Sequence, residues 1–461
     1  MVNKNKNVNI PAFINGMLID RYIDAFNRGI ELVKNSNNIR IIAHYDGDGV
    51  SAASIVVRLF QMKKKRFHLS FVKGVDSNFV NMLPTDGSTL LLLDIGSSAI
   101  DLIKNKHNTI LMDHHPVVGD DDDLINLNPV NYGMDGTREA CGTTISFLFT
   151  ILYDEESWNS IPFFLAGTIA DRQHTGGYNG LNKILVEEAV KRNLITVRVG
   201  LPYYGKPIAE EIRESTEPYL VGITGRDEGV SNLLNTLKID DKSSYLDLYD
   251  NNSKLVEKLN SYIVQYLLNH GVRPEIAIDA VAPRYILKGD IENSLLLSSY
   301  MNACGREGAE SLGVLYAMGD KSQISDLQNL QNNFHQKVIK ELLKIESGNY
   351  TSLKSISYFS VEQPSIAGAV SGISVNYITD SRKPLFGYSV DGNGNVKVSS
   401  RGTRYMIEHG LNLTEVCKTA AEMVGGKGGG HVIASGANIK SEHLKKFMEI
   451  ADKMVSEQLH F

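Results

Sequence analysis

The sequence has few cysteines and no long apolar run, and each shortage excludes a class of protein. Its three cysteines, Cys141, Cys304 and Cys417, lie far apart and match no zinc-binding spacing. We expect them to be reduced thiols in the core, which favours the cytoplasm. No stretch reaches the roughly 18–20 apolar residues needed to span a bilayer, and the first residues hold no apolar signal segment. We therefore expect a cytoplasmic protein that binds no membrane.

An excess of basic residues is also missing. The chain has 47 Lys and Arg against 53 Asp and Glu, a net charge of −6. Any nucleic acid would therefore have to bind in a local positive groove and not through a generally basic surface. Hydrophobic residues at 42% and charged residues at 22% are typical of a globular protein. A chain of 461 residues should form about two or three domains, because single cores rarely grow further.

Polar residues with metal-binding potential follow an apolar segment, Ile39–Ala43, that reads as a strand. His44, Asp46 and Asp48 stand at alternate positions, and in an extended segment such positions point the same way. The glycines between them allow a sharp turn or the close approach of a ligand. Imidazole and carboxylate groups together suit a divalent metal. The simpler alternative is a loop whose aspartates cap a helix starting near Ser51.

Two further apolar runs end in the same way. Thr89–Leu93 ends on Asp94, and Thr109–Met112 ends on Asp113, His114 and His115. Short apolar runs that alternate with helical stretches predict a parallel sheet, and ligands of such sheets lie beyond the carboxyl ends of the strands. A fourth apolar segment, residues 163–170, ends on Asp171; its Ala and Gly favour a helix, although a strand stays open.

Carboxylates that converge without cations would raise one another's pKa and cost folding energy. A pair of divalent metals removes that conflict and can act on a phosphoryl group. Asp94 is the natural bridge, since it follows a central strand, and the mixed donors suit manganese better than magnesium. The alternatives are that Asp94 and Asp171 cap helices and that His115, before Pro116, is a turn residue.

The rest of the chain is less regular. Residues 181–283 carry Gly- and Pro-containing loops and amphipathic helices, so we interpret them as an inserted module. A single apolar stripe predicts one long helix over Ser325–Ile345, within a helical connector of residues 284–349. Residues 350–461 mix strands with helices and contain a glycine-rich loop, Gly425–His431.

The motifs resemble those of the DHH phosphoesterase superfamily in order and spacing. The resemblance rests on His44-Tyr45-Asp46-Gly47-Asp48-Gly49, Leu93-Asp94-Ile95-Gly96, Asp113-His114-His115-Pro116 and Ala170-Asp171. The glycine loop resembles that of the associated DHHA1 domain, and Asn302-Ala303-Cys304-Gly305-Arg306 and Ser399-Ser400-Arg401 resemble elements of RecJ nucleases. The length and layout resemble archaeal RecJ-like exonucleases of the GINS-associated type.

The resemblance implies an α/β fold. It consists of a parallel-sheet DHH catalytic domain at residues 1–180 and a smaller mixed α/β DHHA1 domain at 350–461, joined by the long helix. It also implies that His44, Asp46 and Asp94 hold one manganese ion, and that Asp48, Asp94, His114 and Asp171 hold the other, with Mg²⁺ as a weaker candidate. Asp113 would orient a ligand, and His115 would lie against the scissile phosphate and stabilise or protonate the leaving oxygen.

Substrate phosphates would be bound by a second set of residues that the resemblance implies. These are Asn302, Arg306, Ser400, Arg401, Gly428, Gly429, Gly430 and His431. Simpler interpretations are that the glycine run is a flexible loop and that Arg306 pairs with Glu307 or Glu310.

The function implied is a metal-dependent exonuclease on single-stranded DNA, acting from 5′ to 3′ by a two-metal mechanism. Relatives acting on RNA, on short oligonucleotides or on cyclic dinucleotides provide one alternative. A structural replisome component bound to GINS provides another, although all the ligand positions are present here.

Overall fold

The protein, in a computed structural model, folds into two compact units. Unit 1 comprises residues 1–198 and 283–332, and unit 2 comprises residues 199–282 and 333–461. The structure describes all residues except 1–9, 84–85, 105–107, 121–123, 204, 289–292 and 461. Among the described residues, no helix combines the length and the apolar character that crossing a membrane requires.

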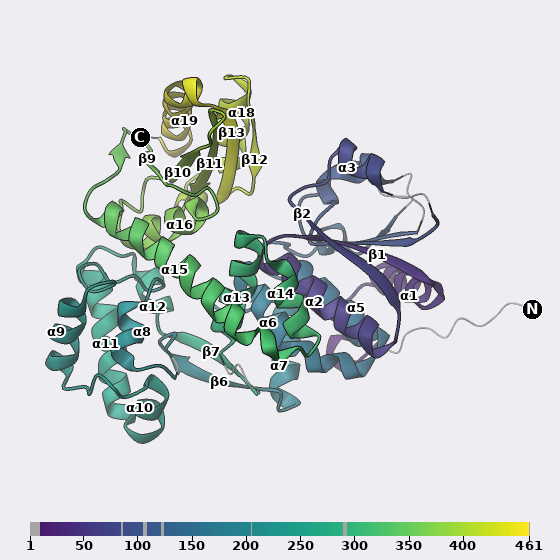
Figure 1. Ribbon diagram of the computed structural model, residues 1–461, viewed down its shortest axis with the longest axis horizontal. Helices are drawn as coiled ribbons and strands as arrows, with labels where there is room; N and C mark the ends of the chain where they lie inside the picture. Colours follow the sequence, from purple (N-terminus) through teal and green to yellow (C-terminus); the bar gives the residue numbers. More distant parts are fainter. Residues whose placement is uncertain are drawn as a thin grey trace, which may run out of the picture. The chain divides into compact units, whose positions relative to one another are not determined.

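Unit 1 is built on a parallel sheet, as expected, and Figure 1 labels its strands β1 and β2. Its five strands lie in the order β2-β1-β3-β4-β5. The strands are β1 (Asn38–His44), β2 (Arg66–Val72), β3 (Thr89–Leu93), β4 (Thr109–Met112) and β5 (Ile125–Asn126). Every residue of β3 is buried, which explains its unbroken run of leucines. The order places β1, β3 and β4 side by side, so that their carboxyl ends form one edge.

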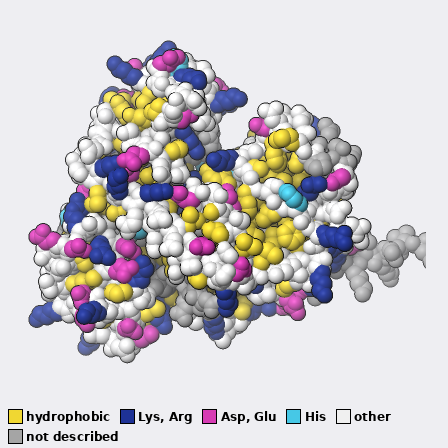
Figure 2. All heavy atoms as spheres, viewed as in Figure 1, with side chains coloured by type: hydrophobic (Ala, Val, Ile, Leu, Met, Phe, Trp, Pro, Cys, Tyr) yellow, Lys and Arg dark blue, Asp and Glu magenta, His cyan; other side chains and the backbone are white. Residues whose placement is uncertain are grey.

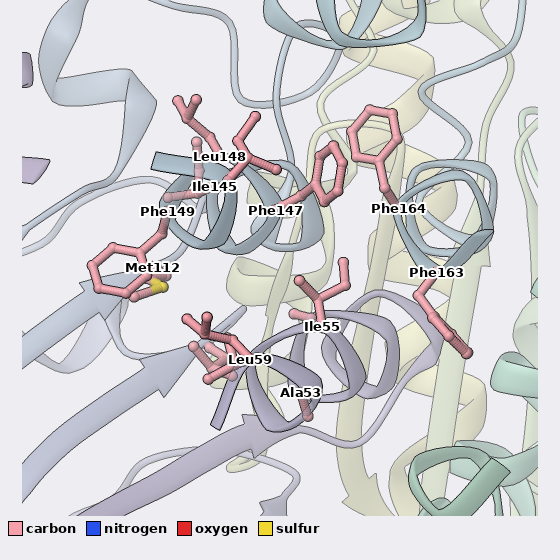
Figure 3. Packing of buried hydrophobic residues seen from close by; sticks show 14 of the residues in the cluster. Ala53, Ile55, Leu59, Met112, Ile145, Phe147, Leu148, Phe149, Phe163 and Phe164 are labelled. Atoms are coloured by element: carbon pink, nitrogen blue, oxygen red, sulfur yellow. The ribbon is translucent and has the colours of Figure 1, made fainter. Parts of the chain in front are cut away.

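Alternate residues of these strands point into two hydrophobic clusters, one on each face of the sheet. Leu91 and Leu93 of β3 pack with helices on one face, while Leu90 and Leu92 pack on the other face. The first cluster contains α1 (Asp20–Asn35), α2 (Gly47–Met62), α5 (Gly142–Tyr153) and α6 (Ile161–Ala170). The second contains residues of α3 (Ser77–Met82) and α4 (Ile100–Ile103). Figure 3 shows Phe147 of α5 beside Phe164 of α6, with Ile55 of α2 below them and Leu59 on the side of Met112.

The edge strand β2 is covered less completely than β3. All of its residues are exposed or half-buried, although Phe67 packs its ring 6.1 Å from that of Phe60. Figure 2 shows hydrophobic side chains on the surface where Figure 1 draws β2 and α14 (Glu310–Ala317). Among the described residues, β2 pairs with β1 alone.

Unit 2 contains a mixed sheet of six strands in the order β12-β13-β11-β10-β9-β8. These strands are β8 (Thr351–Ser352), β9 (Ser357–Ser360), β10 (Leu385–Val390), β11 (Asn395–Arg401), β12 (Lys427–Gly430) and β13 (Ala434–Lys440). Only β9 and β10 run parallel among its pairs. Its C-terminal helices are α16 (Ala367–Tyr377), α17 (Arg404–Glu408), α18 (Leu413–Glu422) and α19 (Leu444–Leu459).

The residues between the two sheets are mainly helical, as expected. They form α7 (Gly180–Lys191), α8 (Ile208–Arg213), α9 (Asp227–Leu237), α10 (Tyr245–Asn251), α11 (Ser253–Asn269), α12 (Pro274–Asp279) and α13 (Ser294–Glu307). A two-stranded sheet of β6 (Ile195–Gly200) and β7 (Ala282–Leu287) interrupts them. The long helix α15 spans Ile324–Glu346, beginning in unit 1 and ending in unit 2.

Two local predictions are corrected. The helix expected from Ser51 begins at Gly47, because Asp46 accepts a hydrogen bond from the Gly49 N–H and caps it. The glycine run expected as a loop is strand β12, which pairs with β13. An added Cβ at Gly428 would lie 2.1 Å from the Cys417 carbonyl oxygen in α18, so close packing of backbones requires glycine there.

Candidate metal centre

The carboxyl edge of the unit 1 sheet gathers the side chains that the sequence singled out. His44 is the last residue of β1, Asp94 directly follows β3, and His114 and His115 follow β4. Asp94 adopts a positive φ of 57°, a backbone conformation that non-glycine residues rarely adopt. Because parallel strands present their carboxyl ends together, residues far apart in the chain meet here.

Among the residues that the structure describes, donor atoms form three groups, and within each group all atoms lie within 4.8 Å of one another. The groups are His44 with Asp46 and Asp94, then Asp94 with His114 and His115, and lastly Asp48 with Cys141 and Asp171. Asp94 belongs to two of them, the position expected of a bridging carboxylate. Its Oδ2 lies 3.4 Å from His44 Nδ1, and its Oδ1 lies 3.3 Å from His114 Nε2.

Burial makes this concentration of charge costly for the protein alone. Asp48 and Asp94 are each nearly inaccessible, at 3% and 2% exposure. Burial, and after it the charges of Asp94 and Asp171, raises the pKa of Asp48 well above its usual value. Burial also raises the pKa of Asp171, to about 6. Without a cation, Asp48 and Asp171 therefore hold a proton more tightly than a free aspartate does.

Two buried atoms at this edge have no hydrogen-bond partner among the described residues. They are His44 Nδ1 and Asp94 Oδ1. An orphaned buried polar atom is rare in proteins, and both of these atoms can ligate a metal through a lone pair. The donor set and the orphaned atoms therefore fit divalent cations.

His114 is oriented by a backbone carbonyl. Its Nδ1 lies 2.5 Å from the Gly136 oxygen, which can only accept a hydrogen bond, so Nδ1 carries the hydrogen. Nε2 is then left facing Asp48, Asp94 and Asp171 at 3.7, 3.3 and 3.9 Å. Such a carbonyl partner is typical of histidines that ligate metals.

Asp113 belongs to none of the three donor groups and supports the two histidines that follow it. Its Oδ2 accepts from the Ser97 N–H at 2.8 Å, while its Oδ1 accepts from the His114 N–H at 2.8 Å and lies 2.7 Å from His115 Nδ1. Burial alone would raise the pKa of Asp113, but the hydrogen bond and charge of His115 hold that pKa below its usual range. A permanently charged Asp113 fixes the orientation of the His115 ring.

Cys141 is a residue of the centre that sequence reasoning missed, since it was expected only to fill the core. Its Sγ donates to Asp48 Oδ1 at 3.1 Å. The Gly142 and Thr143 N–H groups, in the first turn of α5, donate to the two oxygens of Asp48 at 2.9 Å. The unpaired N–H groups of a helix N-terminus bind carboxylates well, and the Gly-Thr-Thr helix start was the available signal.

A chain of buried amides supports Asp171. Gln173 Nε2 donates to Asp171 Oδ2 at 2.8 Å, and Asn182 Nδ2 donates to Gln173 Oε1 at 2.5 Å. Thr144 Oγ1 in turn donates to Asn182 Oδ1 at 2.6 Å. Through this series of hydrogen bonds Gln173 orients Asp171, a role that no sequence pattern indicated.

Two predicted substrate-binding residues also lie beside this centre. Arg306 of α13 donates from Nη1 to the Tyr45 hydroxyl at 3.2 Å. Burial alone would raise the pKa of Asp46, but the charge and hydrogen bond of His44, and after them the charge of Arg306, hold that pKa below its usual range. A Cβ added at Gly47 would lie 2.5 Å from Asn302 Oδ1, which shows how tightly α13 packs on the motif. The structure thus brings Asn302 and Arg306 to the loop that carries Asp46.

The other predicted residues lie in unit 2 and share one end of its sheet. Arg401 pairs with Ala434, and Gly430 pairs with Ser435 beside His431. Arg401 is half-buried, and an added Cβ at Gly368 would lie 2.6 Å from its Nη2. Ser400 is fully buried and donates its hydroxyl to the Ser435 carbonyl at 3.0 Å, so its contact in this structure is within the sheet.

Comparison with known proteins agrees with the domains found. A DHH family N-terminal domain matches residues 38–170, and a DHHA1 domain matches residues 354–457. The chain therefore contains the two domains of the DHH/DHHA1 superfamily. An uncharacterized protein of Methanocaldococcus jannaschii is 28% identical over 443 residues, covering 93% of this chain and 96% of that protein.

Three solved structures share the fold at low sequence identity. RecJ from Thermus thermophilus in complex with Mn²⁺ is 15% identical with a TM-score of 0.60 over 98% of this chain, which spans only 56% of that protein. Exonuclease RecJ bound to manganese is 16% identical, with a TM-score of 0.57, and 97% of this chain covers 96% of that one. CDC45 from Entamoeba histolytica is 10% identical, with a TM-score of 0.66, covering 94% of this chain and 98% of that protein.

Proposed function

We propose that this protein is a metal-dependent exonuclease that hydrolyses phosphodiester bonds of single-stranded DNA, with 5′-to-3′ polarity. The observation that carries the proposal is the membership of Asp94 in two adjacent donor groups. One carboxylate placed between two sets of ligands is the arrangement that holds a pair of metals. Both RecJ structures were solved with manganese bound, which supports the choice of metal.

The ligands divide between two cations. His44, Asp46 and Asp94 would hold one, and Asp48, Asp94, His114 and Asp171 would hold the other. Mn²⁺ accepts this mixture of imidazole and carboxylate, whereas Mg²⁺ prefers oxygen alone. When bound, the pair would neutralise the carboxylates, polarise a phosphodiester oxygen and lower the pKa of water.

The protein's own groups would bind the substrate and move the proton. The Arg306 guanidinium would bind a substrate phosphate through two parallel hydrogen bonds, and its hydrogen bond to the Tyr45 hydroxyl would orient the guanidinium. His115, whose ring is fixed by Asp113, would give a proton to the leaving oxygen. Arg401, the glycine strand and His431 would bind further phosphates on unit 2.

A nucleic acid is the partner that this proposal requires, and GINS stays a prediction made from the sequence resemblance. The experiment is digestion of single-stranded DNA and RNA, labelled at the 5′ or the 3′ end, in the presence of Mn²⁺. We expect mononucleotides to be released from the 5′ end of DNA by the native protein. Asp94→Asn, which keeps the side-chain shape, should be inactive. Equal rates for the two proteins would refute the assigned centre.

Comparing the cleavage rates of a dinucleotide and a long oligonucleotide distinguishes an exonuclease from a phosphodiesterase for short substrates. A preference for the dinucleotide, release from the 3′ end or a preference for RNA would each replace the corresponding part of the proposal.

A further inference from the structure

The turn between β12 and β13 is made of two residues that ordinarily avoid turns. His431 N–H donates to the Ala434 carbonyl at 2.9 Å and Ala434 N–H donates to the His431 carbonyl at 3.1 Å, so Val432 and Ile433 form the two-residue turn at the tip of this hairpin. Two-residue hairpin turns favour Asn, Asp and Gly, because positive φ angles suit them. Val432 and Ile433 have negative φ and branched side chains.

The backbone of this turn is held firmly from both sides. The Val432 carbonyl accepts from the Leu413 N–H at the start of α18, and the Ile433 carbonyl accepts from the Gly402 N–H, each at 2.9 Å. With both carbonyls bound to the body of unit 2, the two side chains stay at the surface, at 42% and 37% exposure. A turn that departs from local preference and still exposes apolar side chains points to a use for them.

The turn adjoins the residues proposed to bind phosphates. Only His431 separates it from the glycine strand Lys427–Gly430, and Ala434, the first residue after it, pairs with Arg401. A single strand whose phosphates bind to Arg401 and to the glycine backbone carries its bases only a few ångströms from those phosphates. Proteins that bind single strands without sequence preference stack the base faces on aromatic side chains. Branched aliphatic side chains cannot stack, but they can remove the same apolar base faces from water.

We infer that Val432 and Ile433 form an apolar platform for the nucleobase of a nucleotide whose phosphate is held on unit 2. This inference rests on the proposed function, because it takes single-stranded nucleic acid as the substrate. Val432 and Ile433 are binding residues in this account: they tighten substrate association and leave the chemical step unchanged. The two side chains favour a nucleotide that carries a base over an abasic nucleotide. They do not distinguish one base from another.

The test combines an altered protein with an altered substrate. The variant is Val432→Ser with Ile433→Ser, since serine is favoured in turns and removes the apolar surface without disturbing the fold. The matched control is Val390→Ser, which removes a 50% exposed branched residue where β10 pairs with Val396, at the other end of the sheet from Arg401. The substrates are oligothymidylates in which one abasic nucleotide is placed at each position in turn.

For the native protein and the control, we expect KM to rise about fivefold when the abasic nucleotide occupies one particular position. For the double serine variant, we expect an elevated KM on the full substrate and no further rise at that position, with kcat unchanged. If KM of the double serine variant rose as much at that abasic position as KM of the native protein does, the inference would be overturned. A change in oligomeric state, measured by light scattering, with unaltered KM would also overturn it by making the turn a protein contact.

Failure of the proposed function looks different. If the native protein cleaves no oligonucleotide, binding of the same abasic series is measured by fluorescence anisotropy in Ca²⁺. Absence of binding to all of them refutes the substrate class itself. Binding that is insensitive to every abasic position refutes the platform alone.

Discussion

The Cys141 thiol donates a hydrogen bond to Asp48 Oδ1 at 3.1 Å, across 93 residues of sequence. This contact joins the start of α5 to the motif that follows β1, and it gives a buried cysteine a role in holding a carboxylate in position.

Replacing Cys141 with alanine should weaken metal binding while leaving the fold intact. Asp48 would keep the Gly142 and Thr143 N–H groups but lose its side-chain donor, so its carboxylate would be less well oriented. We expect Mn²⁺ affinity to fall about tenfold, as for other partners of metal ligands. Calorimetric titration of Mn²⁺ measures it. Cys141→Ser, which retains a donor, should bind close to native affinity, and equal losses in both variants would contradict the role of the hydrogen bond.

Metal binding should displace protons, and the metal-free protein should lose stability as pH rises. Burial raises the pKa of Asp171 to about 6, against about 3.9 for a free aspartate. A raised pKa means that the folded state holds the proton more tightly, so this contribution is complete below about pH 4 and disappears through about pH 6. The pKa values of His44 and His114 are also raised, by nearby carboxylates against the opposing effect of burial, which extends the loss to higher pH.

The measurement is the melting temperature between pH 5 and 8 with and without Mn²⁺. The gap between the two curves should widen as pH rises, because cations no longer compete with protons for the ligands. A gap that narrows with pH would contradict the assignment of these groups as ligands.

Arg306 should affect substrate binding more than metal binding. Its guanidinium is oriented by Tyr45, so Arg306→Ala should raise KM for an oligonucleotide about tenfold or more. Tyr45→Phe removes the acceptor alone and should cause a smaller rise. Steady-state kinetics gives KM, and Mn²⁺ titration of the same variants provides the control. A loss of Mn²⁺ affinity in Arg306→Ala equal to its rise in KM would assign the arginine to the metal ligands instead.

The sequence predicts the parts of this site that local patterns determine. Apolar runs ending on Asp94 and on His114 indicate strands, and the geometry of a parallel sheet then requires these ends to meet. Asp48 was expected in an extended segment but lies in the first turn of α2, because Asp46 caps that helix earlier than hydrophobic periodicity indicates. The glycine strand was expected as a loop, since only the tertiary packing of Gly428 on Cys417 distinguishes the two.

Tertiary contacts between residues far apart in the chain leave no pattern in the sequence from which they could be predicted. Cys141 has no cysteine or histidine at a metal-ligand spacing, and its closeness to Asp48 depends on how α5 packs against α2. Gln173 and Asn182 likewise form their chain only because α7 lies near Asp171. Residues 199–282 belong to the compact unit of the C-terminal sheet, although nothing in their composition links them to it.

The central claim is that the carboxyl edge of the unit 1 sheet holds two cations, with Asp94 between them. Crystals grown with Mn²⁺ and measured near the manganese absorption edge test it directly. We predict two anomalous peaks about 3.5–4 Å apart, each within bonding distance of Asp94, one of them beside His44 and the other beside His114. A single peak that leaves either histidine without a metal, or no peak within reach of Asp94, would contradict it.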